Sequence, residues 1–157
     1  MKKQMKRFGV IFAAMMMCLV MVACSGAGEP EKKTNPNVIS IDQSEVEYLG
    51  HEVTKDYDGT DAIVITYQFT NHGEEAESFN WAFMNQLFQE GVELDYATIF
   101  VDEESFDTLD QAISTEIQPG NSLEVKTTHK LRSLSAPVEV QFESIFTDEK
   151  DSFEIKL

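Results

Sequence analysis

The chain has 157 residues, 28 of them acidic and 12 basic, and its formal net charge at pH 7 is −16. A charge this negative repels phosphate backbones, so the composition argues against nucleic acid as a partner. The length is sufficient for one domain with a core of its own and leaves no room for a second.

The first 23 residues have the three parts of an export signal. Four basic residues come first, an uncharged apolar run from Phe8 to Ala23 follows them, and small residues flank the end of the run. The run is shorter than the roughly 20 apolar residues that span a bilayer, and no basic cluster follows it as a stop signal. Residues 1–23 are therefore predicted to be a cleaved signal peptide rather than a retained transmembrane helix.

The predicted cleavage site resembles the lipobox of bacterial lipoproteins, because Met21-Val22-Ala23 precedes Cys24. The resemblance implies that Cys24 receives a diacylglycerol on its sulfur and becomes the new N-terminus. Two or more acyl chains attach a protein stably to a membrane. The predicted location is therefore extracytoplasmic, with the lipid on Cys24 anchored in the outer face of the cytoplasmic membrane. Residues 24–37 are rich in glycine, proline and polar residues, which predicts a flexible linker behind the lipidated cysteine.

Removal of the signal changes both the charge and the cysteine count. Residues 1–23 hold four of the 12 basic residues and none of the acidic ones, so 8 basic residues remain against 28 acidic and the net charge becomes −20. Cys18 leaves with the signal, so Cys24 alone remains and an internal disulfide is not available. The acidity is explained by the solubility of a surface protein or, alternatively, by attraction of cations or basic peptides.

Alternation of apolar and polar residues dominates residues 38–157 and predicts β-strands. The clearest strand is residues 62–70, where every second side chain is large and apolar. The four side chains on this face are Ile63, Ile65, Tyr67 and Phe69. Further segments with the same alternation are residues 123–131, 138–142 and 153–157.

Turn signals separate these segments. Around Gly50 the alternation changes parity, which predicts a β-bulge within one strand. Sequences typical of turns recur between the strands. They are Asp58-Gly59, Asn71–Gly73, Glu90-Gly91, Pro119–Asn121 and Asp148–Lys150.

Two segments are ambiguous. The residues from Trp81 to Phe88 fit a helical face and, less completely, a strand. A strand is preferred because Glu90-Gly91 and the alternation after it would complete a hairpin. In residues 102–110, Phe106 and Leu109 are three apart among acidic residues, which predicts a short helical turn or an irregular excursion.

Short antiparallel strands at this spacing predict an all-β fold. The expected architecture is an immunoglobulin-like antiparallel β-sandwich of six to eight strands over residues 38–157. Without a disulfide between the sheets, aromatic and β-branched side chains must hold them together. The aromatic residues predicted to do so are Tyr67, Phe69, Trp81, Phe83 and Phe142.

Asp56, Asp58 and Asp61 are the candidate metal ligands, because alternating carboxylates near a glycine suit a hard cation such as calcium. The spacing does not match the twelve-residue loop of an EF-hand. Counted from Asp56, the glycine is at the fourth position instead of the sixth, and the twelfth position, which should supply a bidentate carboxylate, is Tyr67. The alternative is a hairpin turn at Asp58-Gly59 that needs no metal.

The sequence contains no standard catalytic motif, and no cofactor is predicted. The three histidines, at positions 51, 72 and 129, are scattered along the chain. The acidic runs at residues 74–77 and 102–104 contain the type of paired carboxylate used in glycoside hydrolysis, but nothing places two of them across a bond. Trp81, the only tryptophan, is expected in the core, and partial exposure beside the acidic loops would instead indicate a ligand platform.

Several phrases together resemble a known family. They are Ala62–Asn71, Ser78–Trp81, Phe88–Leu94 and Glu116–Gly120. Over Ile39 to Leu157 the chain resembles the immunoglobulin-like domain of unknown function found in lipoproteins of Gram-positive bacteria. The resemblance implies a β-sandwich and a place at the cell surface, and it carries no catalytic residue and no ligand.

Three functions are compatible with these features. The first is a non-enzymatic binding module that meets a peptide, protein or wall component at the cell surface. The second is an acidic surface protein that binds a cation or a cationic peptide. The third, a hydrolytic enzyme, would need a concave pocket with perturbed carboxylates.

Overall fold

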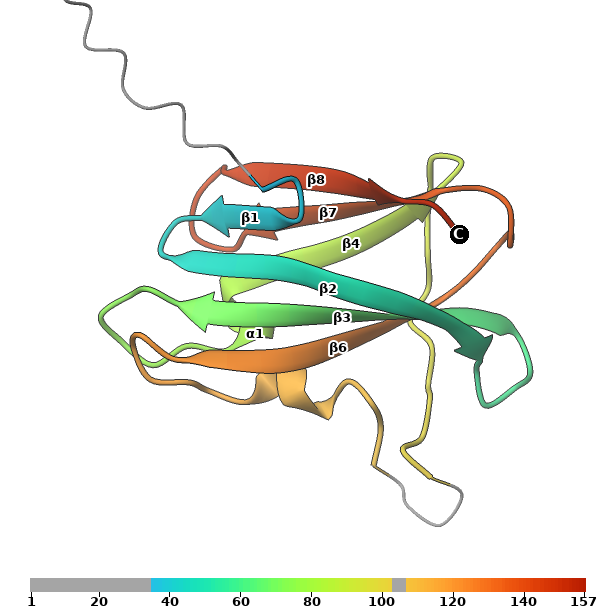
Figure 1. The fold of residues 1–157 in the computed structure, drawn as a ribbon, viewed down its shortest axis with the longest axis horizontal. Helices are drawn as coiled ribbons and strands as arrows, with labels where there is room; N and C mark the ends of the chain where they lie inside the picture. Colours follow the sequence, from blue (N-terminus) through green and yellow to red (C-terminus); the bar gives the residue numbers. More distant parts are fainter. Residues whose placement is uncertain (1–34, 103–106) are drawn as a thin grey trace, which may run out of the picture. The chain divides into compact units, whose positions relative to one another are not determined.

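Within residues 35–102 and 107–157, which the computed structural model describes, eight strands form two four-stranded antiparallel sheets (Figure 1). The first sheet has the order β1-β2-β3-β6. Its strands are β1 (Val38–Ile41), β2 (Ser44–Lys55), β3 (Asp61–Asn71) and β6 (Ser122–Lys130). The second sheet has the order β5-β4-β7-β8. Its strands are β4 (Phe83–Gln89), β5 (Val92–Glu93), β7 (Val138–Ser144) and β8 (Lys150–Ile155).

The predicted signal peptide, Cys24 and most of the predicted linker lie outside the described residues, as does Phe106. Among the residues that are described, no helix has the length and hydropathy to cross a membrane. The two helical elements there are a single α-turn, α1 (Phe79–Ala82), and a 3₁₀ turn, η1 (Gln111–Ser114).

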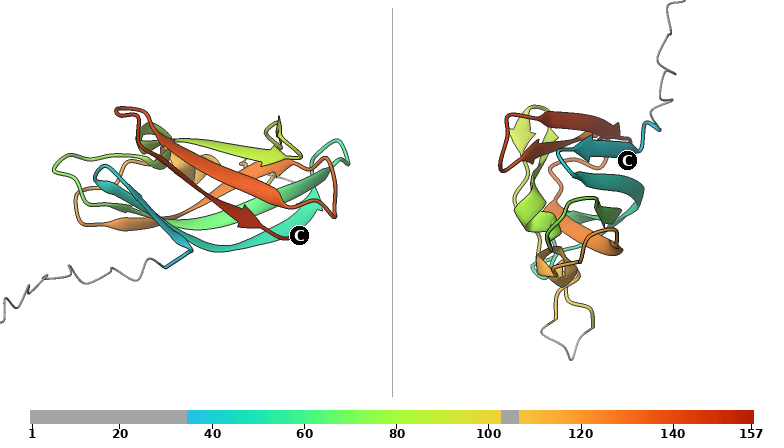
Figure 2. Two further views of the ribbon diagram at one scale, coloured as in Figure 1. Left: turned by 90° about the horizontal axis from the view of Figure 1, so that it is seen from above. Right: turned by 90° about the vertical axis from the view of Figure 1, so that its left-hand side faces the viewer.

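The chain changes sheets three times, which confirms the predicted sandwich. It passes from β3 to β4, returns from β5 to β6, and passes again from β6 to β7. As a result β3 pairs with β6 instead of with the strand that follows it, as in immunoglobulin-like domains. The first strand, β1, and the last, β8, lie side by side at one edge of the two layers (Figures 1 and 2).

The central strand β3 is where the predicted alternation was clearest. It pairs with β2 on one side and β6 on the other, and its inward face is fully buried. The side chains on that face are Ile63, Ile65, Tyr67 and Phe69. The predicted bulge in β2 is confirmed as well, because the register shifts between Tyr48 and Gly50. Gly50 has a φ of +153°, a backbone conformation that residues other than glycine rarely adopt.

The start of β4 corrects the expected strand. One helical turn, α1, occupies Phe79–Ala82, and the strand begins only at Phe83. A helical turn places residues three and four apart on one side, so Phe79, Ala82 and Phe83 face the core. Trp81 faces outward with 61% of its surface exposed, and its predicted place in the core was wrong.

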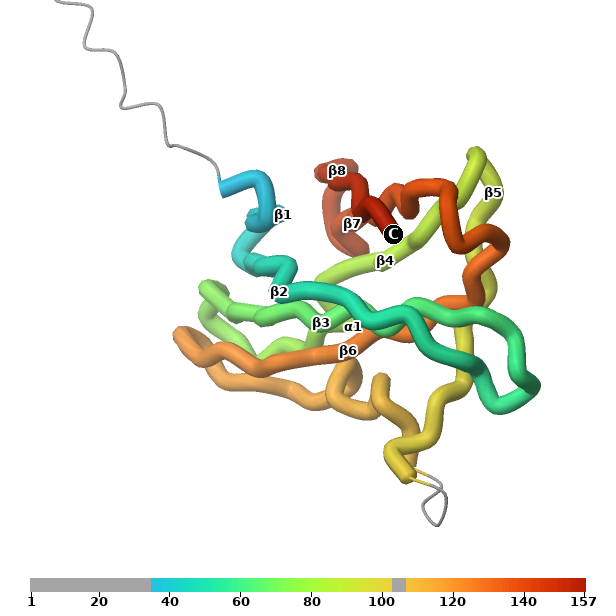
Figure 3. Tube along the Cα trace, turned by 45° about the vertical axis from the view of Figure 1, so that its right-hand side comes forward, coloured from blue at the N-terminus to red at the C-terminus, as the bar shows by residue number. Residues whose placement is uncertain are grey.

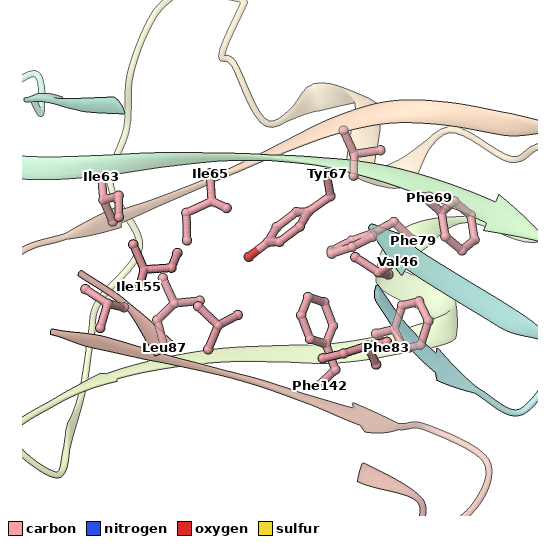
Figure 4. Close-up of a cluster of buried hydrophobic side chains, with 14 of the residues drawn as sticks. Val46, Ile63, Ile65, Tyr67, Phe69, Phe79, Phe83, Leu87, Phe142 and Ile155 are labelled. Carbon is pink, nitrogen blue, oxygen red and sulfur yellow. The ribbon is translucent and has the colours of Figure 1, made fainter. Parts of the chain in front are cut away.

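Phe79 takes the core position that was expected for Trp81. Only 2% of Phe79 is exposed, and its ring centroid lies 5.8 Å from that of Tyr67, 5.9 Å from Phe83 and 6.1 Å from Phe142. Figure 4 shows these rings meeting between the two sheets. Stacked and edge-to-face pairs at such distances add to the free energy gained by burial, so this aromatic cluster links the sheets without a covalent bond.

The connection from β5 to β6 covers the outer edge of β6 (Figure 3). The backbone N–H of Ala97 donates to the carbonyl of Thr128 at 3.0 Å, and the N–H of Lys130 donates to the carbonyl of Asp95 at 2.8 Å. These bonds satisfy backbone groups that an uncovered edge strand would leave open. Of the segment 102–110, where a short helical turn or an irregular excursion was predicted, residues 103–106 lie outside the described part of the chain. Thr108 forms an isolated bridge with Phe100, and the 3₁₀ turn η1 follows the segment at Gln111–Ser114.

Candidate functional site

Three connections meet at one end of the sandwich and enclose a hollow of about 500 Å³. They are the β1–β2 turn, the loop from β3 to α1, and the β7–β8 connection, and the right-hand view of Figure 2 looks at this end. We call this hollow the tip pocket. Its walls include Asp42, the acidic loop Glu74–Glu77, Trp81 and Phe146.

A buried asparagine shapes the loop on one side of the tip pocket. The side-chain nitrogen of Asn71 donates to the carbonyls of Glu75 at 2.7 Å and Ile117 at 3.1 Å, and its oxygen accepts from the N–H of Gly73 at 2.8 Å. All three bonds fix backbone groups of the loop or of the segment before β6. The side chains of the loop are thereby left to face the pocket and solvent.

The tip pocket carries two exposed aromatic rings. Trp81 is 61% exposed and Phe146 is 60% exposed, and their centroids lie 6.0 Å apart at an interplanar angle of 65°. Large aromatic side chains that remain uncovered in this way supply contact area for a partner. The exposure beside acidic loops is the observation that favours the ligand-platform interpretation of Trp81.

Free carboxylates lie beside these rings. Glu74 and Glu75 are exposed, and among the described residues neither side chain has a hydrogen bond or an ion pair. Glu77 is half-buried and accepts a hydrogen bond from the Ser44 hydroxyl at 2.6 Å. Because no cation neutralises Glu74 or Glu75, the mouth of the tip pocket has a negative potential.

Carboxylates next to aromatic faces suit an organic cation. An ammonium or guanidinium group is attracted by the ring face and pairs with the carboxylates. The aliphatic part of a lysine or arginine side chain can lie against the ring while its charged end reaches the oxygens. The tip pocket therefore has the chemistry to hold a basic side chain.

The three predicted metal ligands lie at the β2–β3 hairpin, where lysines pair with them. The Lys130 nitrogen is 2.8 Å from Asp56 and 2.9 Å from Asp58, and the Lys55 nitrogen is 2.6 Å from Asp61. Within residues 35–102 and 107–157, no group of three or more histidine, cysteine or acidic side chains is placed to hold a metal ion. Calcium binding at Asp56, Asp58 and Asp61 stays a prediction.

Asp56 is the buried member of this ion-pair network. Burial alone raises the pKa of its carboxyl, but the hydrogen bond from Lys130 and those from the N–H groups of Thr98 and Tyr57 outweigh burial and hold the pKa below its ordinary value. The same contacts with Asp56 and Asp58 raise the pKa of Lys130. The network ties the hairpin to β6 and to the segment that covers it.

The histidines lie on separate elements. His51 is exposed on β2, where its Nδ1 is 2.7 Å from the Tyr48 hydroxyl, and His72 is exposed in the loop after β3. His129 is buried on β6 beneath the ring of Tyr96. The structure does not bring them together as a catalytic or metal-binding set.

Sequence reasoning missed Phe146. It continues the alternation of β7 and would be assigned to the core, but β7 ends at Ser144 and the chain turns outward. The signal that could have identified it is Ser144 followed by Thr147 and Asp148, a set of residues typical of turns.

Comparison with known proteins places the chain in a family. No curated protein matches it. A solved structure from Staphylococcus aureus subsp. aureus NCTC 8325, described as a putative lipoprotein, has a TM-score of 0.60 and 12% identity, covering 76% of this chain and 88% of that one. A protein from Enterococcus faecalis solved by NMR has a TM-score of 0.55 and 21% identity, covering 77% of this chain and 90% of that one.

At these identities the two structures establish a shared fold and no more. The match to a family model is more specific, because it extends over residues 23–144 and so includes the strands from β1 to β7. It agrees with the resemblance noted from the sequence. The chain therefore belongs to the family described as "Domain of unknown function (DUF5067)".

Proposed function

We propose that this chain is a lipid-anchored, non-enzymatic binding domain on the outer face of the cytoplasmic membrane, and that its tip pocket binds a basic side chain of a peptide or protein. The observation that carries the proposal is the pair of exposed rings, Trp81 and Phe146, beside the unpaired carboxylates of Glu74 and Glu75. It favours a cationic peptide among the functions compatible with the sequence.

The energies involved suggest a modest affinity that depends on several contacts. An exposed cation–π contact contributes about 0.5 to 1 kcal/mol, and an exposed ion pair about 0.2 to 1 kcal/mol. A net charge of −20 after removal of the signal adds long-range attraction for basic partners. Binding to a peptide with several lysines should therefore weaken as salt concentration rises.

The test uses Trp81 as a reporter, because it is the only tryptophan in the chain. We expect a peptide of alternating lysine and glycine to change the Trp81 emission in a saturable way at low salt. The same peptide with acetylated lysines keeps the aliphatic stems and loses the charge, so it should bind much more weakly. An emission that does not respond to the lysine peptide would contradict the proposed function.

A pair of double variants separates the tip pocket from the overall charge. Glu74→Gln with Glu75→Gln should lower the affinity for the lysine peptide about fivefold, since two exposed ion pairs together contribute about 1 kcal/mol. Glu52→Gln with Glu154→Gln makes the same charge change on exposed strand positions outside the pocket, and should have little effect. Equal weakening by both would mean that the peptide responds to net charge and not to the pocket.

The proposed anchor rests on the residues before Cys24 and on the likeness to the staphylococcal structure. We expect mass spectrometry of the protein from a Gram-positive host to find a mature chain that begins at a diacylglyceryl-modified Cys24 and fractionates with membranes. In Cys24→Ser, neither the lipid nor a mature chain that begins at position 24 should be found. An unmodified Cys24 in the wild-type chain would contradict lipid anchoring.

A further inference from the structure

The β1–β2 turn and the β7–β8 connection are joined by side chains across the two sheets. The Asp42 carboxylate accepts a hydrogen bond from the Ser144 hydroxyl, and its two oxygens lie 3.2 and 3.3 Å from the Thr147 hydroxyl, which donates to them. The backbone N–H of Asp42 donates to the Glu149 carboxylate at 3.1 Å. Four polar residues thus meet close to where β1 and β8 lie side by side.

Asp42 is suited to this position by its backbone. Its φ is +52°, in the left-handed region that aspartate and asparagine tolerate better than most residues. The turn directs the carboxylate at the β7–β8 connection, so its oxygens are already occupied by Ser144 and Thr147. Asp42 therefore lines the tip pocket without being free to pair with a ligand.

Ser144 connects Asp42 to the backbone of Phe146 by hydrogen bonds. While it donates to Asp42, its oxygen accepts hydrogen bonds from the backbone N–H groups of Phe146 and Thr147, each at 3.0 Å. Ser144 is buried, which strengthens the hydrogen bonds of its hydroxyl. The backbone of Phe146 is held by these bonds while its ring lies 6.0 Å from that of Trp81.

We infer that Asp42 and Ser144 form a latch that holds Phe146 in the wall of the tip pocket, against Trp81. Both are positioning residues, since the latch touches the ligand only through the ring that it places. Its role in binding rests on the proposed function, whereas its role in placing Phe146 does not.

The experiment compares variants that remove the latch with variants that keep part of it. Asp42→Gly removes the carboxylate and keeps a residue that tolerates the positive φ, and Ser144→Ala removes the hydroxyl. Asp42→Asn keeps the turn and one oxygen acceptor, so it should retain part of the latch. The control is Ser122→Ala, which deletes the cross-strand hydrogen bond of Ser122 to Thr70 at 2.8 Å outside the pocket.

The first readout is hydrogen exchange of the Phe146 and Thr147 amides by NMR, together with ring contacts between Phe146 and Trp81. Asp42→Gly and Ser144→Ala should each speed the exchange of both amides about tenfold, because Ser144→Ala removes the oxygen that accepts from both N–H groups and Asp42→Gly removes the partner that orients this hydroxyl. The Trp81–Phe146 contacts should weaken in the same variants. The exchange rates of the two amides in Asp42→Asn should lie between those of these variants and those of the wild type. In Ser122→Ala the two rates should equal those of the wild type.

The second readout is the affinity for the lysine peptide, followed through Trp81. Asp42→Gly and Ser144→Ala should weaken it about threefold, which is the order of an exposed cation–π contact with Phe146. Unchanged amide exchange and unchanged ring contacts in both variants would overturn the latch, whether or not a peptide binds. Loosened amides with full peptide affinity would overturn its role in binding and leave the proposed function standing.

Discussion

A Phe79→Ala variant is expected to lose about 3 to 5 kcal/mol of its free energy of unfolding. Phe79 is 2% exposed, and its ring contacts those of Tyr67, Phe69, Phe83 and Phe142. Truncation would leave a cavity among rings that come from both sheets, and partial relaxation would recover only some of the lost contacts. Against a typical net stability of about 5 to 15 kcal/mol, the loss is large enough to unfold a marginal domain.

The measurement is a urea titration followed by far-ultraviolet circular dichroism. Trp81→Ala is the control, because this larger residue sits two positions further along and is mostly exposed, so its removal should change stability by less than about 1 kcal/mol. Phe79→Leu keeps most of the side-chain volume, so it should lower the free energy of unfolding less than Phe79→Ala does. This variant can still be measured if Phe79→Ala does not fold. Similar losses for Phe79→Ala and Trp81→Ala would contradict the assignment of Phe79 to the core and Trp81 to the surface.

Acidification is expected to remove about 3 kcal/mol of stability through His129. This side chain is 1% exposed, with the Tyr96 ring 4.8 Å away, and its Nδ1 is buried without a hydrogen-bond partner among the described residues. Burial disfavours the charged imidazolium and lowers the pKa from 6.5 to about 4, although the negative charge of Asp110 acts in the opposite direction. Because each pKa unit corresponds to about 1.4 kcal/mol, this lowering of the His129 pKa corresponds to about 3 kcal/mol of stability that is lost in acid.

The sign follows from proton binding in the two states. Between pH 6.5 and about pH 4 the unfolded chain binds a proton at His129 that the folded protein does not, so the free energy of unfolding falls as the pH falls through this window. Because the pKa of Asp56 is lowered in the folded protein, the free energy of unfolding also falls as this carboxyl takes up a proton. That loss occurs at pH values below 3.8, the ordinary pKa of aspartate. The two groups therefore act in different pH ranges.

Urea titrations at several pH values test the histidine effect. His129→Phe keeps an aromatic ring beside Tyr96 and removes the titration, so the difference in stability between this variant and the wild type should change by about 3 kcal/mol across the window. A difference between His129→Phe and wild type that is independent of pH would refute the effect.

Much of the fold could be predicted because its strands are amphipathic. In β3 every second residue reaches the core, and the parity change in β2 is sufficient to locate the bulge at Gly50. Trp81 was misplaced because α1 is a single turn at the start of a strand. Four residues are too few for helical and strand periodicity to be distinguished.

The tip pocket could be predicted only in parts. The acidic loop at residues 74–77 and the two possible environments of Trp81 were visible in the sequence, but they gave no reason to include Phe146. That residue is far along the chain and reaches Trp81 only because the two sheets stack and the latch holds the β7–β8 connection in place. Contacts of this kind depend on three-dimensional packing and leave no local pattern.

The adjacency of β1 and β8 has a consequence for biogenesis. Ile39 and Ile41 on the first strand and Ile155 on the last are all buried in the same core, so the native state requires segments that leave the ribosome far apart in time. Contacts so distant in sequence make a β-sandwich fold slowly. Under the proposed export, the nascent chain should consequently remain open enough to pass through a translocation channel, and the domain should acquire its structure only after β8 has left that channel.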